Sequence, residues 1–331
     1  MAHFSIIGGS GFIGTRLCQR IEKDSNSSFS ILDKTPSLSF KGNAVLADVR
    51  SVDSLHQNIP DDSILVNLAA EHRDDVRPLS LYDEVNVDGA NNICTVAREK
   101  NVKLIVFTST VAVYGFSPLG TDESGKITPF NDYGRTKHEA EQIFKTWQAE
   151  LPNERTLVIV RPTVVFGEGN RGNVYNLLKQ IASGRFLMFG DGKNIKSMAY
   201  VENLAAFIEY SLSFKPGVHI YNYIDKPDFE MNRLISEVRK ILFRKNNIGL
   251  RLPAFLGIII GYIADVIAKI IDKPLPVSSI RVKKFMHNTQ FETSISETGF
   301  IPPVSLEEGL ARTLRYEFLE DNSGKITFET E

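Results

Sequence analysis

Two side chains with usable chemistry stand four residues apart, in the stretch Tyr133-Gly134-Arg135-Thr136-Lys137. Residues at this spacing share one face of a helix, so the phenol and the ammonium are expected to point the same way. A phenol with a pKa near ~10 is a poor base at neutral pH, but an adjacent cation stabilises its phenolate. The spacing therefore predicts that Tyr133 acts as base and acid, with Lys137 lowering its pKa.

Hydroxyl groups end the apolar run that precedes this helix, Val106-Phe107-Thr108-Ser109-Thr110. A β-branched and aromatic run of this kind is typical of a buried strand. Hydroxyls at its carboxyl end can hold a substrate oxygen between the strand and the helix. Ser109 and Thr110 therefore join Tyr133 and Lys137 as candidate catalytic residues, although the Tyr-x-x-x-Lys spacing also occurs by chance in helices.

A glycine-rich turn follows a short predicted strand, residues 3–7, near the amino terminus. Gly8, Gly11 and Gly14 permit a tight turn, close approach of the backbone to a pyrophosphate, and close packing of the next helix. The helix, expected to begin near Thr15, offers free N–H groups and a partial positive charge to that pyrophosphate. The pattern predicts a dinucleotide site.

A second predicted strand, residues 29–32, ends at Asp33. A carboxylate there accepts hydrogen bonds from both ribose hydroxyls and repels a 2′-phosphate, which favours NAD over NADP. The alternative is a structural glycine turn with a surface aspartate.

Strands and helices alternate through the first half of the chain, which predicts an α/β fold of the Rossmann type, a doubly wound parallel sheet. Further strands are expected at 44–47, 64–68, 103–107 and 157–160, and one long helix at about 81–100. Beyond Val164 the elements shorten. We therefore expect a dinucleotide-binding domain at 1–163, with later strands interleaved, and a smaller α/β substrate domain at 164–331.

The composition limits the classes of function. A formal net charge of −2 argues against binding to nucleic acid, which requires a basic surface. The two cysteines, Cys18 and Cys94, lie in apolar helical settings and have no metal-ligand spacing, so we expect core residues and no metal site. The chain enters a strand at once, without a signal peptide, which favours a cytoplasmic protein.

Taken together, the motifs resemble the extended short-chain dehydrogenase/reductases, the NAD-dependent epimerase/dehydratase family. The resemblance runs through Gly8-x-x-Gly11-x-x-Gly14, Asn67-Leu68-Ala69-Ala70, Tyr133-x-x-x-Lys137 and Arg161-Pro162-Thr163. It implies that Asp48 contacts the adenine amino group and that Asn86 braces the catalytic strand. The other residues that it implies contact NAD are Phe12, Ile13, Lys34, Val49, Leu68, Ala69, Ala70, Asn86, Thr108, Tyr133, Lys137, Pro162 and Thr163.

Four further stretches, 70–76, 169–177, 196–201 and 278–285, are similar to a narrower group. Its members are bacterial 4-epimerases that act on N-acetylglucosamine carried on undecaprenyl diphosphate, for surface polysaccharide of the O-antigen and lipopolysaccharide type. Val111 and Ala112 stand where 4,6-dehydratases carry an acid–base pair, which leaves epimerisation or net oxidation and reduction. A UDP-sugar 4-epimerase, a 4-keto-sugar reductase and a non-catalytic NAD-binding scaffold stay open as alternatives.

Four residues are candidates for substrate binding. Arg171 and Asn173 precede a predicted helix, 174–183, whose amino end suits a diphosphate; alternatively Asn173 is a plain helix cap. Lys196 replaces the arginine usual in nucleotide-sugar epimerases and cannot form a bidentate fork. His72 is either a substrate contact or a solvated loop residue.

An apolar segment, 253–264, continues as a predicted helix to 271 that carries Asp265, Lys269 and Asp272 on one face. Twelve apolar residues are too few to span a bilayer. Basic residues flank the segment and favour anionic headgroups, which predicts a peripheral enzyme at the cytoplasmic face of the bacterial inner membrane. A buried core helix or a homodimer interface is the alternative. The basic residues are Arg239, Lys240, Arg244, Lys245, Arg251, Lys273, Arg281, Lys283 and Lys284.

Overall fold

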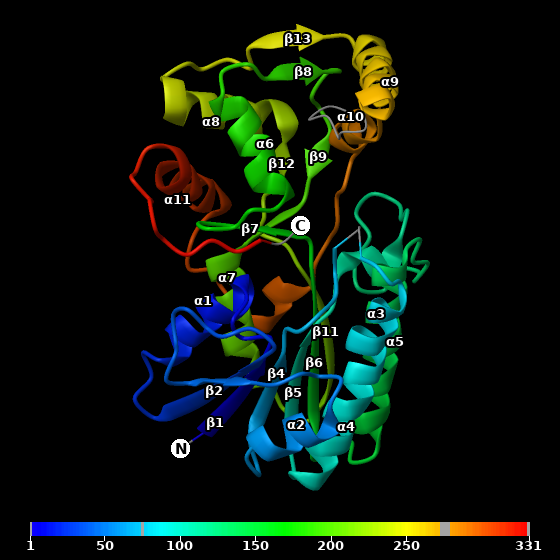
Figure 1. Cartoon of the computed structure of the whole chain (residues 1–331), viewed down its shortest axis with the longest axis vertical. Coiled ribbons are helices and arrows are strands. Elements are labelled where there is room, and N and C mark those ends of the chain that lie inside the picture. The colour runs from blue at the N-terminus through cyan, green and yellow to red at the C-terminus, as the bar shows by residue number, and fades with distance from the viewer. Residues whose placement is uncertain (1, 74–75, 272–278, 330–331) are drawn as a thin grey trace.

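The computed structural model describes residues 2–73, 76–271 and 279–329, and only the backbone of residues 280, 281 and 284. A seven-stranded sheet forms one half of the molecule (Figure 1), in the order β11-β6-β5-β4-β1-β2-β3. Every neighbouring pair of strands is parallel, which confirms the predicted doubly wound sheet. The strands are β1 (Ala2–Ile7), β2 (Ser27–Asp33), β3 (Ala44–Leu46), β4 (Ile64–Asn67), β5 (Leu104–Thr108), β6 (Thr156–Pro162) and β11 (Gly217–Tyr223).

Helices cover both faces of this sheet, so its central strands are buried and consist of continuous apolar runs. One core lies between the sheet and α1 (Phe12–Ile21) with α7 (Val201–Ser211). The other lies beneath α2 (Val52–Asn58), α4 (Gly89–Glu99) and α5 (Asp132–Ala149). Cys18 and Cys94 are buried in these two cores, as predicted.

The long helix expected at 81–100 is present, because residues 80–99 are helical without a break, but a π-helical stretch that was not predicted interrupts its α-helical geometry. The segment consists of α3 (Ser80–Tyr82), a π-helical stretch η1 (Asp83–Asp88) and then α4. Asn86 lies in the π-helical stretch and is buried, with both ends of its amide hydrogen-bonded. Helix α1 begins earlier in the sequence than predicted, at Phe12 directly after Gly11 rather than near Thr15.

The other half of the molecule has a core of its own beneath α6 (Asn173–Ala182), α8 (Met231–Phe243) and α11 (Leu306–Phe318). Figure 1 shows this half facing the carboxyl ends of the sheet strands, with α9 (Ala254–Ile271) and α10 (Ser279–Met286) at its far end. Between α6 and α8 the chain returns to the sheet half through α7 and β11. The short strands and 3₁₀ turns are β7 (Val164–Phe166), β8 (Leu187–Phe189), β9 (Ile195–Lys196), β10 (Met198–Tyr200), β12 (Phe229–Glu230), β13 (Leu250–Leu252), η2 (Val111–Tyr114) and η3 (Ile295–Thr298).

Candidate active site

The candidate catalytic residues meet where α5 begins beside the end of β5. Asn131 caps α5, its side-chain oxygen accepting from the Gly134 N–H at 2.9 Å, and Tyr133 lies in the first turn. Thr110 follows β5 and caps η2 by accepting from the Ala112 N–H at 3.1 Å. The Thr110 hydroxyl is also hydrogen-bonded to the Tyr133 phenol. The structure thus brings together two of the residues that the sequence pointed to.

Burial sets the protonation of Tyr133 and Lys137 in opposite directions. Burial and the nearby Tyr82 raise the pKa of Tyr133 to about 12, although the Thr110 hydrogen bond opposes them. Burial also lowers the pKa of Lys137 to about 7, while its Nζ lies 4.2 Å from the centre of the Phe107 ring. Tyr133 therefore needs positive charge beside it to ionise at neutral pH, which an oxidised nicotinamide, when bound, and a protonated Lys137 would supply.

The hydroxyl of Ser109, which was expected to hold a substrate oxygen, is bonded to another side chain of the protein. Its hydroxyl donates to the Glu141 carboxylate at 2.5 Å, and both residues are buried. Of the three hydroxyls at the end of β5, Thr110 is therefore the one bonded to Tyr133. The third hydroxyl, Thr108, donates to the Asn67 carbonyl at 3.1 Å.

A buried ion pair holds the catalytic helix to the sheet. Arg161 at the end of β6 donates to Glu141 through Nε at 2.8 Å and Nη2 at 2.6 Å. Its Nη1 donates to the Tyr114 hydroxyl at 2.7 Å, which in turn donates to Asn222 on β11 at 2.8 Å. Burial works to raise the pKa of Glu141, but the hydrogen bonds and charge of Arg161 outweigh it and hold that pKa at about 2.

The role of Glu141 was not predicted from the sequence, although its spacing on α5 is a signal for it. Glu141 stands four residues beyond Lys137 and eight beyond Tyr133. At that spacing all three lie on one face of α5, the face that meets the sheet. The negative charge of Glu141 helps Lys137 to keep its proton.

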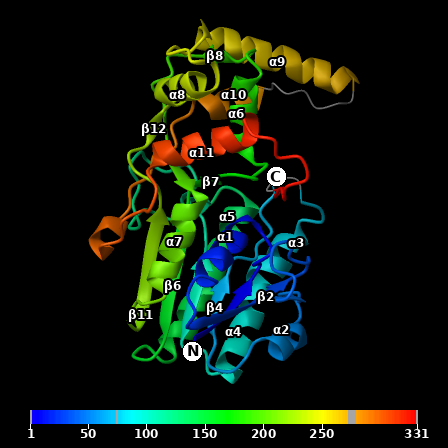
Figure 2. The same ribbon diagram turned by 90° about the vertical axis from the view of Figure 1, so that its left-hand side faces the viewer.

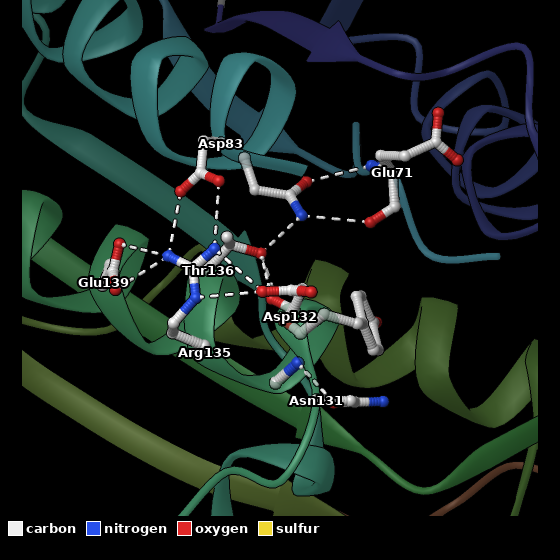
Figure 3. A network of polar contacts seen from close by, with 10 residues as sticks. Glu71, Asp83, Asn131, Asp132, Arg135, Thr136 and Glu139 are labelled. Carbon is white, nitrogen blue, oxygen red and sulfur yellow. Dashed lines mark hydrogen bonds and ion pairs between the residues drawn. The ribbon is translucent and has the colours of Figure 1, made fainter. Parts of the chain in front are cut away.

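A second polar network, nearer the surface, fixes the start of α5 against the π-helical stretch (Figure 3). Arg135 binds Asp83 through two nitrogens at 2.9 and 3.0 Å, and also binds Asp132 and Glu139. Asn86 bonds the Glu71 N–H and carbonyl at 2.9 and 3.0 Å and donates to the Thr136 hydroxyl at 3.0 Å. The expectation that Asn86 braces the catalytic strand is therefore corrected, since it braces the loop after β4 against α5.

The glycine turn has the close packing that a dinucleotide site requires. Gly8 has a φ of +76°, and a Cβ on it would lie 2.6 Å from the Ala69 nitrogen in the loop after β4. A Cβ on Gly14 would lie 2.5 Å from the Cα of Gly9. This turn lies where the strand order reverses between β1 and β4, the place where open α/β sheets bind ligands. The residues present fit a bound dinucleotide.

Asp33 lies at the end of β2 beside this turn, as expected. One carboxylate oxygen accepts from the Ser10 N–H at 3.0 Å, and the other accepts from the N–H and hydroxyl of Thr35. The turn and the carboxylate are thus held together, in the arrangement that suits a ribose next to a pyrophosphate.

The remaining predicted cofactor residues lie at or just after the carboxyl ends of the strands, except Phe12 and Ile13, which begin α1. Their contacts with NAD stay a prediction. Asp48 is paired with Arg50 at 2.6 Å, which lowers the pKa of Asp48. Thr163 bonds the Tyr223 carbonyl at 3.3 Å, and Lys34 is exposed. The others are Phe12, Val49, Pro162 (all buried) and Ile13, Leu68, Ala69 and Ala70 (all half-buried).

The four candidate substrate residues are spread over several elements. Arg171 pairs with Glu317 at 2.8 Å and lies 4.2 Å from the centre of the Tyr175 ring. Asn173 is the first residue of α6 and Gly172 is its cap, so the alternative that Asn173 caps this helix is wrong. Lys196 donates to the His287 carbonyl at 2.6 Å, and burial lowers its pKa to about 8. His72 is exposed in the loop after β4.

Some sequence predictions fall outside the described part of the chain. These concern Asp74, Asp75, Asp272, Lys273 and Ser278, and the side chains of Arg281 and Lys284. Within residues 2–73, 76–271 and 279–329, no group of three His, Cys, Asp or Glu side chains is placed to hold a metal ion.

Several known proteins are similar to this chain in sequence or in architecture. A protein from Escherichia coli O157:H7, named N-acetyl-alpha-D-glucosaminyl-diphospho-ditrans,octacis-undecaprenol 4-epimerase, is 48% identical over 328 residues, 98% of each chain. The UDP-glucose 4-epimerase of Vibrio cholerae is 25% identical over 96% of each chain. The crystal structure of UDP-N-acetylglucosamine 4-epimerase from Bacillus cereus superposes with a TM-score of 0.75 over 97% of this chain and 98% of that one, at 15% identity, which supports the fold alone.

The family comparison agrees with the geometry of the turn and of α5. Residues 4–223 match the model of the "NAD dependent epimerase/dehydratase family", which takes in all of the sheet except the first two residues of β1, and every candidate catalytic residue. The chain belongs to the NAD-dependent epimerase/dehydratase family.

Proposed function

We propose that this protein is an NAD-dependent isomerase that inverts C4 of N-acetylglucosamine or N-acetylgalactosamine linked to undecaprenyl diphosphate. The observation that carries the proposal is the 48% identity, over 98% of both chains, to a protein named for that reaction. The likeness is nearly twice that to the UDP-glucose 4-epimerase of Vibrio cholerae, at 25%. The lipid-linked sugar is thus favoured over a nucleotide sugar.

The site contains what the first step needs. Tyr133 takes the proton of the C4 hydroxyl, Thr110 holds the same oxygen through its hydroxyl, and Lys137 stabilises the phenolate. NAD, when bound, would supply a hydride acceptor and donor for C4. Tyr133 would return the proton to the same oxygen once the keto sugar has turned over in the site.

The residues after Thr110 support epimerisation over elimination. Val111 and Ala112 form the first turn of η2 and carry no ionisable group. Loss of water from the keto sugar needs an acid and a base near C5 and C6. Elimination of water from the keto sugar is therefore disfavoured, and return of the hydride to the opposite face is the outcome that we propose.

The helix α9 supports a membrane-bound substrate. Within the described part of the chain it is the one helix long and apolar enough to cross a bilayer, yet little of it is buried. Large side chains along it are exposed, among them Phe255 at 60%, Ile263 at 55% and Ile270 at 76%. Figure 2 shows α9 along the end of the molecule farthest from the sheet, projecting beyond the helices beneath it. Exposed apolar surface of this extent marks an interaction site.

We infer that α9 lies in the plane of the membrane surface rather than across the bilayer. Length does not exclude a helix that spans the bilayer, because the apolar character extends beyond residue 264 over all 18 residues of α9. The attachment of α9 to the protein favours the position in the membrane plane: Gly257, Gly261 and Ala264 are buried, and a Cβ on Gly257 would lie 2.7 Å from the Phe189 ring. Asp265 accepts from the Ser279 N–H of α10 at 3.2 Å. One side of α9 is thus fixed to the protein, and its opposite side is free to enter lipid.

Basic residues beside α9 favour an anionic membrane over a second copy of the chain. Lys269 is exposed on the helix, and Arg251 is exposed just before it. Lys283 of α10 donates to the Tyr262 hydroxyl at 2.9 Å and is also exposed. Cations around an apolar helix attract the negatively charged phosphates of lipids. In a symmetric dimer built on α9, the same cations of the two subunits would lie close together and repel one another.

A groove of about 780 Å³ lies at the start of α9. Its lining includes Pro253 and Ala254, where α9 begins, together with Asn194 and Met286. Asn194 and Met286 are neighbours in sequence of the Lys196 strand and of His287, the partner of Lys196, although Lys196 itself does not line the groove. A diphosphate near Lys196 with its lipid directed along this groove fits the proposed substrate.

The experiment offers the purified protein two substrates, N-acetylglucosaminyl diphospho-undecaprenol in vesicles and UDP-N-acetylglucosamine in solution. Inversion at C4 is followed in both by separating the two sugars after release. We expect turnover of the lipid-linked sugar to be much the faster. Faster turnover of the nucleotide sugar would overturn the proposal and return α9 to a role in protein contacts.

A further inference from the structure

The carboxyl-terminal tail returns from α11 to the loop before α6. The Phe328 N–H donates to the Gly169 carbonyl at 2.8 Å, and the Arg171 N–H donates to the Phe328 carbonyl at 2.9 Å. A Cβ on Gly169 would lie 3.1 Å from the Ile326 carbonyl oxygen, so the two backbones pack closely. The tail is thus docked by paired hydrogen bonds rather than by an apolar core of its own.

The same docking brings the Phe328 ring onto the dinucleotide turn. The centres of the Phe328 and Phe12 rings are 5.6 Å apart, with the rings tilted by 48°. Phe12 directly follows Gly11 and is the first residue of α1, where unpaired N–H groups would face the pyrophosphate of a bound dinucleotide. Residues from the two ends of the chain therefore meet at the cofactor turn.

A third element completes this contact. A Cβ on Gly167 would lie 3.2 Å from the Phe12 ring, and Arg16 of α1 donates to the Glu168 carbonyl at 2.9 Å. Phe12 is only 6% exposed as a result. The turn, the 167–171 loop and the tail therefore form one packed unit, in which Phe328 touches both of the other parts.

We propose that the tail, through Phe328, is part of the wall of the dinucleotide site and slows the release of NAD. Opening of the site at Phe12 requires the tail to detach, and the tail is held by few contacts with much of its surface exposed. A protein that returns the hydride to the same sugar has to keep its cofactor throughout the cycle. The inference depends on the use of NAD and not on the carrier of the sugar.

The experiment measures release of bound dinucleotide from purified holoprotein. Wild type, Phe328→Ala, Phe328→Trp and a chain ending at Glu320 are each diluted into a large volume, filtered at intervals, and assayed for retained dinucleotide. We expect release to be about tenfold faster in Phe328→Ala, faster still in the shortened chain, and near wild type in Phe328→Trp.

The matched control is Phe318→Ala. Phe318 lies at the end of α11 and stacks on Tyr175, with ring centres 6.1 Å apart, so its loss weakens the same half of the molecule at another contact. We expect it to lower the melting temperature without changing the release rate. Wild-type release from Phe328→Ala, or equal acceleration in Phe318→Ala, would overturn the proposal. If the shortened chain fails to fold, the three Phe variants still decide the outcome.

Discussion

Glu141→Gln is the most informative single change in the catalytic half of the protein. The carboxylate is fully buried, accepts from Arg161 at 2.6 and 2.8 Å and from Ser109 at 2.5 Å, and faces an Arg161 that is itself 2% exposed. Removing one partner of such a pair leaves the other charge buried without compensation, which costs about 3–5 kcal/mol. The amide keeps one acceptor oxygen, so we expect a loss near ~3 kcal/mol in the free energy of unfolding by urea.

The same buried pair should also make the stability depend on pH. The pKa of Glu141 is held at about 2 in the folded protein, against 4.5 ordinarily. A carboxyl group with a lowered pKa stabilises the fold above its unfolded value, and that contribution is lost as the pH falls from about 4.5 towards 2. The shift corresponds to roughly 3 kcal/mol. We expect this part of the acid dependence to be absent from Glu141→Gln.

The same variant should also change the pH profile of catalysis. Burial lowers the pKa of Lys137 to about 7, and the charge of Glu141 works against that fall. Without that charge Lys137 loses its proton at a lower pH, and the phenolate of Tyr133 then loses its supporting cation. We expect kcat to decline at a lower pH in the variant than in the wild type.

The matched control is Glu139→Gln on the same helix. Glu139 pairs with Arg135 at 3.1 Å, but its side chain is 43% exposed, and a pair at the surface contributes about 0–1 kcal/mol. We expect its stability and pH profile to match the wild type. An unfolding free energy of Glu141→Gln within about 1 kcal/mol of the wild type, from pH 3 to pH 7, would refute the reasoning about the buried pair.

Three further predictions concern the base, the cofactor and the membrane. Tyr133→Phe should reduce kcat by about 10²–10⁴-fold, because it removes the proton acceptor, while the NAD content of the purified protein stays unchanged. Asp33→Asn should narrow the preference for NAD over NADP in binding titrations by at least about tenfold, because the repulsion of a 2′-phosphate is lost. Ile263→Gln with Ile270→Gln should weaken binding to anionic vesicles in flotation by at least about tenfold, since both side chains are exposed on α9, whereas Leu38→Gln, equally exposed in the sheet half, should not.

The parts of the site that local periodicity controls could be predicted from the sequence. The turn at Gly8 and the carboxylate of Asp33 each follow a buried strand, so they could be placed by counting along the chain. That a hydroxyl at the end of β5 lies beside the start of the Tyr133 helix could likewise be predicted, although the sequence left open whether it is Ser109 or Thr110. Such features depend on residues within a few turns of one another.

Other parts depend on contacts between distant segments, and the sequence did not reveal them. The π-helical stretch around Asn86 accompanies bonds to Glu71 and Thr136, which no helical pattern indicates. Ser109 binds Glu141 rather than standing beside Tyr133, because the buried Arg161 pair brings that carboxylate to the end of β5. Tertiary packing determines these positions, and the local sequence pattern carries no information about them.

The most direct test of the central claim follows the hydrogen at C4. The purified protein, with no cofactor added, is given N-acetylglucosaminyl diphospho-undecaprenol that carries deuterium at C4, and the product sugar is examined by mass spectrometry. If Tyr133 and tightly held NAD oxidise C4 and return the same hydride to the other face, the epimer keeps its deuterium at C4. Loss of deuterium to solvent, or no reaction until NAD is supplied, would contradict the account.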